Sequence, residues 1–198
     1  DIKCECPKAA NEKALDILNK GVDSIGFNVP AKELSAEYIS TLLDGIQAEC
    51  VELNFQTCQC QSVELAKILV AYFQEKGYDP AKIEGSICFD PIGKMITKGK
   101  DTTEKLACAK ELVEIFAAYP NFRAVAVNAF YLTNAGAYSY QDLGYALAWG
   151  NEYMAQLTEA GVAPKLPPRT SSSTWVSTVF TSWRLPRSVQ PACCGHRL

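Results

Sequence analysis

The sequence has no apolar run of the roughly 18 to 20 residues that a helix needs to cross a bilayer. Its N-terminus also lacks the basic-then-apolar pattern of a secretory signal. From these two absences we expect a cytoplasmic protein. Asp1 stands where an initiator methionine is expected, so we also expect residues upstream of it.

Histidine is nearly absent, because His196 is the only one in the chain. No Gly-x-Gly-x-x-Gly stretch and no P-loop is found, which argues against a nucleotide-binding protein. Acidic residues are absent after Pro164, where five basic residues follow, whereas all 22 Asp and Glu lie before it. The acidic body gives no reason to expect binding to nucleic acid.

Cysteine is plentiful, with nine residues, but no pair has the two-residue gap of zinc knuckles. An odd number of cysteines without an export signal favours reduced thiols over a disulfide framework. A cysteine-based metal-binding protein stays open as an alternative. The nine residues are Cys4, Cys6, Cys50, Cys58, Cys60, Cys88, Cys108, Cys193 and Cys194.

The rest of the chain alternates strand-like and helix-like segments. Strands are predicted at residues 22–27, 50–55, 83–89 and 123–129, and helices at 11–19, 62–75, 103–118 and 140–160, with another helix starting after Ser35 as its N-cap. Gly77 and Gly161 stand where C-terminal caps belong.

Consecutive βα units predict an α/β fold with a parallel sheet. Four strands are too few for a closed eight-stranded barrel, so we expect residues 1–163 to form a partial (β/α)8 TIM-type barrel. A flavodoxin-like open sheet is the alternative. Residues 164–198 are expected to be an irregular tail.

Each predicted strand carries a carboxamide or carboxylate near its end: Asn28, Asn54, Asp90 and Asn128. Ligands of parallel βα folds sit at the carboxyl ends of the strands, so the four side chains are candidates to line one pocket. The competing interpretation is local capping, because Asn and Asp readily bond nearby backbone amides.

The stretch Tyr131-Leu132-Thr133-Asn134-Ala135-Gly136-Ala137 resembles Tyr-His-x-x-Glu-Ala-Gly-Ala, a signature of the catalytic chains of the methylmalonyl-CoA mutase family. Similarity to the small, non-catalytic chains of this family runs over about residues 1–162. The most specific stretches are residues 13–24, 90–93 and 134–153. Leu132 replaces the signature histidine and Asn134 the glutamate.

The resemblance implies a heterodimer in which a large chain binds adenosylcobalamin and interconverts (R)-methylmalonyl-CoA and succinyl-CoA. It implies no catalytic residue and no bound cofactor in this chain, because Leu132 cannot transfer a proton and His196 does not match the family's Asp-x-His-x-x-Gly cobalt-ligand motif. A degenerate pocket would include Tyr131, Leu132, Asn134 and Gln141. An independently active acyl-CoA mutase or other barrel enzyme is the alternative, opposed by Leu132.

Tyr145, Trp149 and Tyr153 follow one another at helical spacing in the predicted last helix. Aromatic residues at i, i+4 and i+8 share one face. We expect this face to pack into the core, with a subunit-facing role as the alternative.

The tail from residue 164 loses the family resemblance and is rich in Ser, Thr, Pro and Trp. Back-translation of residues 181–187, read one base earlier, gives Tyr-Phe-Met-Glu-Ile-Ala-Lys, which is similar to a family helix at this position. Our hypothesis is a single-base slip in the gene or its sequencing. The alternative is a natural disordered basic tail that serves as an interaction arm.

Overall fold

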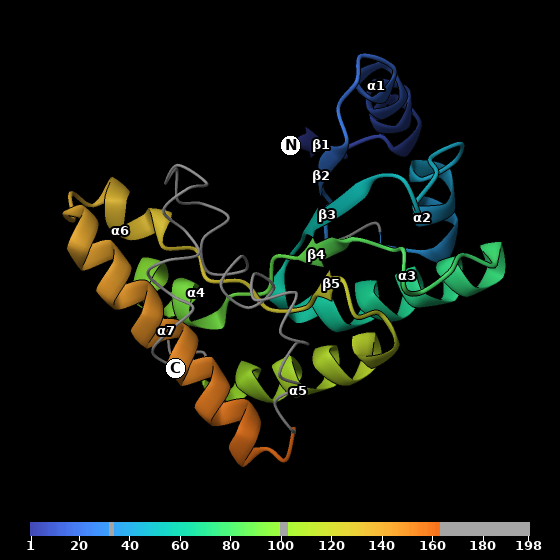
Figure 1. Ribbon diagram of the computed structural model, residues 1–198. Helices are drawn as coiled ribbons and strands as arrows, with labels where there is room; N and C mark the ends of the chain where they lie inside the picture. Colours follow the sequence, from blue (N-terminus) through green and yellow to red (C-terminus); the bar gives the residue numbers. More distant parts are fainter. Residues whose placement is uncertain (32–33, 100–102, 163–198) are drawn as a thin grey trace. The chain divides into compact units, whose positions relative to one another are not determined.

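The computed structural model describes residues 1–31, 34–99 and 103–162, which form two compact units (Figure 1). Unit 1 holds residues 1–89 and 111–125. Of the described residues, unit 2 holds 90–99, 103–110 and 126–162.

Unit 1 contains a five-stranded sheet whose neighbouring strands all run parallel. The strands lie side by side in chain order: β1 (Ile2–Lys3), β2 (Ser24–Asn28), β3 (Glu52–Gln56), β4 (Gly85–Ile87) and β5 (Phe122–Arg123). This confirms the predicted α/β fold with a parallel sheet. Within these five strands the order never reverses, unlike the order of a flavodoxin-like sheet.

Three helices of unit 1 lie on the same side of this sheet in Figure 1: α1 (Pro7–Asn19), α2 (Ala36–Leu42) and α3 (Ser62–Lys76). Helix α2 packs against both α1 and α3. Right-handed crossovers between strands in sequential order place successive helices on one side, as observed. The short turn η1 (Gln59–Gln61) leads into α3.

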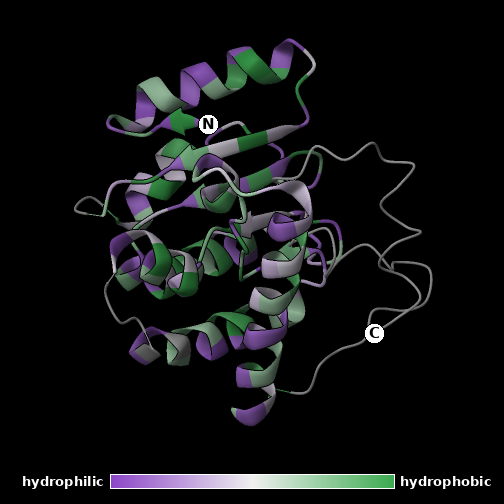
Figure 2. Cartoon of the chain, turned by 90° about the vertical axis from the view of Figure 1, so that its left-hand side faces the viewer, coloured by the Kyte–Doolittle hydropathy of each residue, from purple (hydrophilic) through white to green (hydrophobic). Residues whose placement is uncertain are grey.

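The sheet has one apolar and one polar face. Ile25, Phe27, Leu53, Phe55 and Ile87 are buried, and the rings of Phe27 and Phe55 stack with their centroids 5.7 Å apart. The alternate residues of the same strands are polar and more exposed, as the period of two in a strand requires. Figure 2 shows hydrophobic and hydrophilic residues interspersed along α1, as expected for a helix with one buried side.

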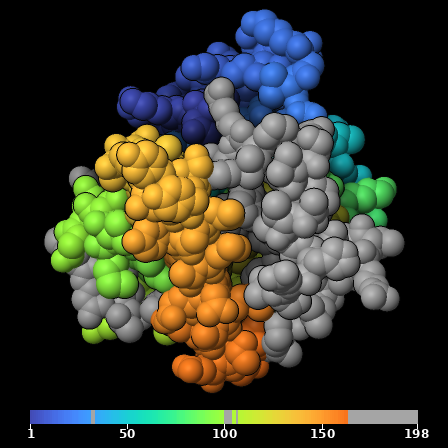
Figure 3. Space-filling view, turned by 60° about the vertical axis from the view of Figure 1, so that its left-hand side comes forward, coloured from blue at the N-terminus to red at the C-terminus, as the bar shows by residue number. Residues whose placement is uncertain are grey.

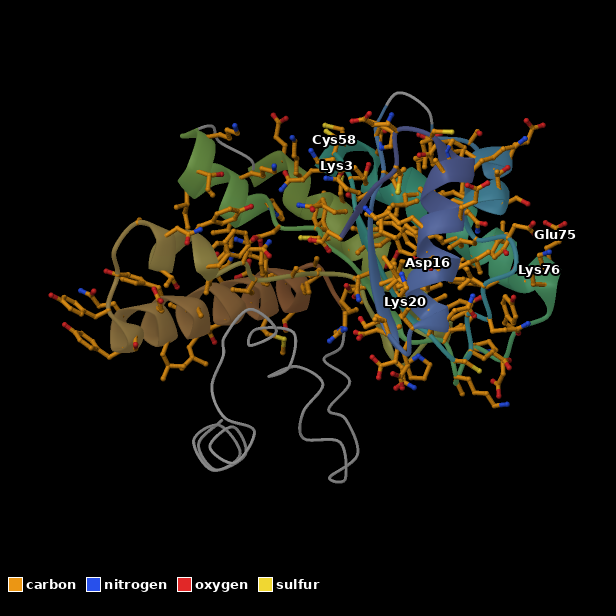
Figure 4. All side chains as sticks on the ribbon, turned by 90° about the horizontal axis from the view of Figure 1, so that it is seen from above. Lys3, Asp16, Lys20, Cys58, Glu75 and Lys76 are labelled. Atoms are coloured by element: carbon orange, nitrogen blue, oxygen red, sulfur yellow. The ribbon has the colours of Figure 1, made fainter. Side chains whose placement is uncertain are left out.

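Two predicted helix ends are confirmed in unit 1. The backbone N–H of Tyr38 donates to the Ser35 hydroxyl at 3.1 Å, which makes Ser35 the N-cap of α2. Gly77 follows α3 with a φ of +69°, the left-handed conformation that glycine adopts without steric cost. At the end of α1, Asp16 forms an exposed ion pair at 2.6 Å with Lys20, the residue after the helix; both are labelled in Figure 4.

Unit 2 is helical among its described residues. It contains α4 (Pro91–Lys98), the turn η2 (Thr103–Lys105), α6 (Phe130–Asn134) and α7 (Ser139–Glu159). Helix α5 (Leu106–Ile115) carries residues of both units, and η3 (Phe116–Ala118) continues it. No helix in the described part of the chain is long and apolar enough to cross a membrane.

The sequence missed β1, α4 and α6 and overestimated β5. Strand β1 has two residues and α4 follows Asp90 directly, so neither offers enough periodic sequence to be recognised. The strand predicted at 123–129 is too long, because β5 spans only Phe122–Arg123. Among the described residues β5 pairs only with β4, and a strand without a second neighbour loses half of its backbone hydrogen bonds.

The predicted tail, 164–198, lies outside the described residues.

Replacing Ser35 with alanine is expected to lower the free energy of unfolding by about 1 kcal/mol, because the amide of Tyr38 loses its side-chain acceptor. Ser35→Asp keeps an acceptor and is expected to retain most of the stability. Ser40→Ala, at an exposed position of the same helix, is the matched control. Urea unfolding followed by circular dichroism measures all three, and equal losses in Ser35→Ala and Ser40→Ala would contradict the assignment.

Candidate functional site

A buried carboxylate organises unit 2. Asp90 precedes α4 and is 4% exposed. Its Oδ1 accepts a hydrogen bond from the backbone N–H of Gly93 at 3.0 Å, so Asp90 is the N-cap of α4. Pro91 occupies the first helical position, where a missing N–H is tolerated and the fixed φ favours the helix.

Three further donors reach the same carboxylate from distant parts of the chain. The hydroxyl of Tyr153, on α7, donates to Oδ1 at 2.7 Å. Asn128 donates to Oδ2 with its side-chain amide at 2.8 Å and with its backbone N–H at 3.1 Å. We call Asp90, Gly93, Asn128 and Tyr153 the Asp90 cluster. It ties the start of α4, the segment before α6 and the middle of α7 to one group.

Burial and hydrogen bonding act on the Asp90 cluster in opposite directions. Burial raises the pKa of Asp90 because it disfavours the charged form, and the hydrogen bonds from Tyr153, Gly93 and Asn128 offset part of this rise. The pKa of Tyr153 is also raised, first by burial and then by the nearby Asp90 charge. Tyr153 therefore stays a proton donor to Asp90, while its oxygen accepts from the N–H of Ile92 at 3.0 Å.

The Asp90 cluster is packed too tightly for a side chain at Gly93. A Cβ atom there would lie 2.3 Å from Oδ2 of Asp90 and 3.0 Å from the ring atom Cζ2 of Trp149. The contact with Asp90 is far inside van der Waals range, so the position requires glycine.

Two of the predicted pocket residues, Asp90 and Asn128, are therefore brought together. Both oxygens of Asp90 accept hydrogen bonds from groups of unit 2 itself. These bonds support the local-capping interpretation for Asp90. A ligand-binding role for the pair stays a prediction.

The signature stretch begins on α6, a short helix that the sequence analysis did not predict. Tyr131 and Leu132 are half-buried, whereas Asn134 is exposed. The rings of Phe130 and Tyr131 approach to 4.2 Å between centroids. The carbonyl of Leu132 accepts hydrogen bonds from the N–H groups of Ala135 and Ala137, both at 3.0 Å, so the backbone of Leu132 shapes the turn after α6.

Two hydrogen bonds hold the first turn of helix α7 to the residues that precede it. The side-chain oxygen of Gln141 accepts from the backbone N–H of Tyr138 at 2.9 Å. Asp142, buried at 2% exposure, accepts from the hydroxyl of Thr133 on α6 at 2.5 Å. Gln141 therefore has a capping role in this structure, and its pocket role stays a prediction.

The other two pocket candidates belong to unit 1. Asn28 is exposed at the last position of β2. Asn54 lies in the middle of β3 and not at its end, which corrects the sequence interpretation. It donates to the hydroxyl of Ser24 at 3.1 Å and accepts from that of Ser86 at 2.5 Å, so it links three strands on the polar face of the sheet.

The described cysteines are free thiols in different surroundings. Burial raises the pKa of Cys4 to about 11, whereas Cys6 and Cys58 are exposed (Cys58 is labelled in Figure 4). No group of three or more His, Cys, Asp or Glu suited to a metal ion occurs among the residues with described positions. Those residues also include no histidine to ligate a metal, because His196 lies beyond them.

Sequence reasoning missed Tyr153 and Gly93 as partners of Asp90. Gly93 had a local signal, because Asp-Pro-x-Gly is a readable N-cap pattern with its acceptor three residues before the amide it binds. Tyr153 had none, since it lies 63 residues from Asp90 in sequence. Of the three aromatic residues predicted to share a buried face, Trp149 and Tyr153 are buried, but Tyr145 is 59% exposed.

Comparison with known proteins gives one consistent result. The model of the family described as methylmalonyl-CoA mutase matches residues 22–171. The methylmalonyl-CoA mutase small subunit of Porphyromonas gingivalis is 40% identical over 156 residues, which cover 79% of this chain and 25% of that protein. The small subunit of Streptomyces virginiae is 28% identical over 156 residues, which again cover 79% of this chain and 25% of that protein.

A large subunit is also similar. The methylmalonyl-CoA mutase large subunit of Streptomyces virginiae is 26% identical over 134 residues, covering 63% of this chain and 18% of that protein. The chain thus spans about a quarter of the length of the small subunits it matches. These relatives support the mutase interpretation and neither of its two alternatives. The frame-slip hypothesis for the tail stays a prediction.

Tyr153→Phe removes the hydroxyl that donates to Asp90 and accepts from Ile92. We expect the free energy of unfolding to fall by about 2 kcal/mol, the usual cost of losing a buried hydrogen bond to a charged group. Tyr145→Phe, on the exposed side of the same helix, is the control and is expected to change stability by less than about 0.5 kcal/mol. Denaturant unfolding measures both, and an unchanged midpoint for Tyr153→Phe would refute the role of the cluster.

Cys4 is expected to resist alkylation while the chain is folded. With a pKa of about 11, only roughly one thiol in a thousand is ionised at pH 8, and the side chain is buried. Iodoacetamide labelling followed by peptide mass spectrometry should modify Cys6 and Cys58 first, and labelling of Cys4 should accelerate as the pH approaches its pKa. Equal rates for Cys4 and Cys58 at pH 8 would show that the environment of Cys4 is misassigned.

Proposed function

Because the chain belongs to the methylmalonyl-CoA mutase family, we propose that it serves as the non-catalytic, small-subunit part of such a mutase. In this proposal a large partner subunit interconverts (R)-methylmalonyl-CoA and succinyl-CoA. The chain supports that partner by assembling with it.

The observation that carries the proposal is Leu132. In the catalytic signature this position holds histidine, which can donate and accept protons near neutral pH. The side chain of Leu132 has no polar atom, and its neighbours Tyr131 and Asn134 stand on the same short helix. The segment therefore keeps a structural role through the backbone of Leu132 and loses the chemical one.

The adenosylcobalamin of the complex is proposed to reside in the large subunit. The described residues do not fit this cofactor, because they offer no histidine to ligate its cobalt. Asp90, the one carboxylate among the pocket candidates of unit 2, is already bound by four donors from its own unit. The reaction is therefore assigned to the partner.

A partial (β/α)8 barrel is the architecture proposed for this subunit. Five parallel strands in sequential order, with α1, α2 and α3 on one side, are consistent with part of such a barrel. The relatives are about four times longer than the matched segment. In a longer chain, further βα units would pair with the free edges of β1 and β5.

Co-expression with the large mutase subunit of the source organism tests the proposal. We expect the two chains to co-elute in size-exclusion chromatography, and the co-eluting fraction to show cobalamin-dependent mutase activity. Leu132→Ala is expected to leave that activity within about twofold, because the position takes no part in catalysis. The large subunit alone is the control for activity that does not depend on this chain.

Two results would count against the proposal. Failure of the chains to co-elute would remove the subunit role. A loss of activity of about a hundredfold or more in Leu132→Ala, with the complex intact, would indicate that this chain takes part in the chemistry.

A further inference from the structure

Two pairs of cysteines in the described part of the chain are separated by a single residue, and they differ in exposure. Cys58 and Cys60 lie in the segment that leads from β3 into α3, and both are exposed free thiols. The other pair, Cys4 and Cys6, lies in the N-terminal segment, which reaches the surface in dark blue in Figure 3. Cys6 is exposed there, but Cys4 is 1% exposed and its Sγ donates to the carbonyl of Ile2 at 3.4 Å. Only the first pair therefore offers two accessible thiols.

The backbone places the Cα atoms of Cys58 and Cys60 at a distance that a disulfide can join. Gln59 stands between them and is the first residue of η1, so its backbone is helical. From the radius and rise of such helices, a helical residue brings the Cα atoms on either side of it to about 5 to 5.5 Å. Disulfides join Cα atoms that are about 4.4 to 6.8 Å apart.

The conformation of Cys58 removes the usual obstacle to pairing over one residue. In a continuous helix, side chains two positions apart do not face each other. Cys58 precedes η1 with φ −65° and ψ 135°, which is extended backbone, so only Cys60 of the pair has a helical conformation. The helical rule therefore does not hold the two side chains apart, and both are exposed and can change rotamer.

Few hydrogen bonds hold the turn that carries the pair. The carbonyl of Cys58 accepts from the backbone N–H of Gln61 at 2.9 Å and from the Ser62 hydroxyl at 3.4 Å. The buried oxygens Thr57 Oγ1 and Gln61 Oε1 make no hydrogen bond with the residues that the structure describes. Buried polar atoms without a partner carry a desolvation cost. The turn therefore loses little when it rearranges around a new covalent bond.

We propose that Cys58 and Cys60 form a reversible thiol–disulfide switch at the start of α3, with a low-molecular-weight disulfide such as glutathione disulfide as the oxidant. One cysteine thiolate attacks a sulfur of the oxidant, which forms a mixed disulfide and releases one glutathione. The other thiolate attacks the protein sulfur of that mixed disulfide and releases the second glutathione. The protein gives up two electrons and two protons, and glutathione disulfide is reduced to two thiols.

A disulfide closed over one residue is expected to be easily reduced. Departures from the preferred disulfide geometry store strain, and strained or exposed disulfides are the labile ones. Such a pair fits a chain whose cysteines are otherwise reduced, because disulfides in reducing compartments are transient or redox-sensing. Closure changes the backbone at Cys58, so we expect its carbonyl to lose the N–H of Gln61 and the first turn of α3 to loosen. The switch needs no partner chain and does not rest on the proposed subunit role.

Titration of the full chain with glutathione disulfide tests the proposal. The remaining thiols are then alkylated, and the chain is cleaved with chymotrypsin, which separates Cys50 from the pair by cutting after Phe55. Mass spectrometry should find at least about ten times more internal disulfide between Cys58 and Cys60 than within residues 4–6. Excess reduced glutathione should restore both thiols.

Two variants isolate the second step of the exchange. Cys60→Ser removes the thiol that resolves the mixed disulfide, so Cys58 is expected to accumulate bound glutathione. Cys6→Ser changes an exposed thiol of the other pair and is the matched control, which should form the disulfide like the wild type.

Hydrogen exchange of the oxidised and reduced wild-type chain reads the effect on the fold. Amides of residues 61–64 should exchange at least about fivefold faster after oxidation, because the first turn of α3 opens more often. Amides of α1 should keep their rates.

Three results would overturn the inference. The first is glutathione on both Cys58 and Cys60 of the wild type, without a bond between them. The second is a disulfide within residues 4–6 that forms as readily, since exposure would then not select the pair. The third is unchanged exchange at residues 61–64 in the oxidised chain, which would remove the link to α3.

Discussion

The buried Asp90 carboxylate is the constraint on which unit 2 depends. A charged group at 4% exposure is stable only when donors surround it, and here the donors come from three separated segments. Moving α4, α7 or the segment before α6 would cost the carboxylate at least one of its four hydrogen bonds. The cluster thus fixes the start of α4, the middle of α7 and the segment that leads into the Leu132 helix with one carboxylate.

This arrangement explains how a chain can keep family residues without their chemistry. The resemblance at Asp90-Pro91-Ile92-Gly93 corresponds to a helix cap, and Gln141 also caps a helix. Leu132 keeps the backbone hydrogen bonds of its turn although its side chain cannot catalyse.

The sequence predicted what is local and missed what is distant. The caps at Ser35 and Gly77 were readable because their partners lie within a few residues. The bond from Tyr153 to Asp90 was not, because no periodicity links residues so far apart in sequence. Strand 123–129 failed for another reason: its valines favour a strand, but the ladder of β5 needs a second neighbouring strand that the described residues do not supply. Tyr145 had the spacing of a core residue, and only the structure places it outside.

The central claim is that this chain assembles with a catalytic subunit and leaves the chemistry to it. Native mass spectrometry of the co-purified chains, with cobalamin present, tests this most directly. The account predicts one copy of each chain, with cobalamin retained by the large subunit after the two are separated and none on this chain. Cobalamin that stays with this chain, or the absence of any mixed complex, would contradict it.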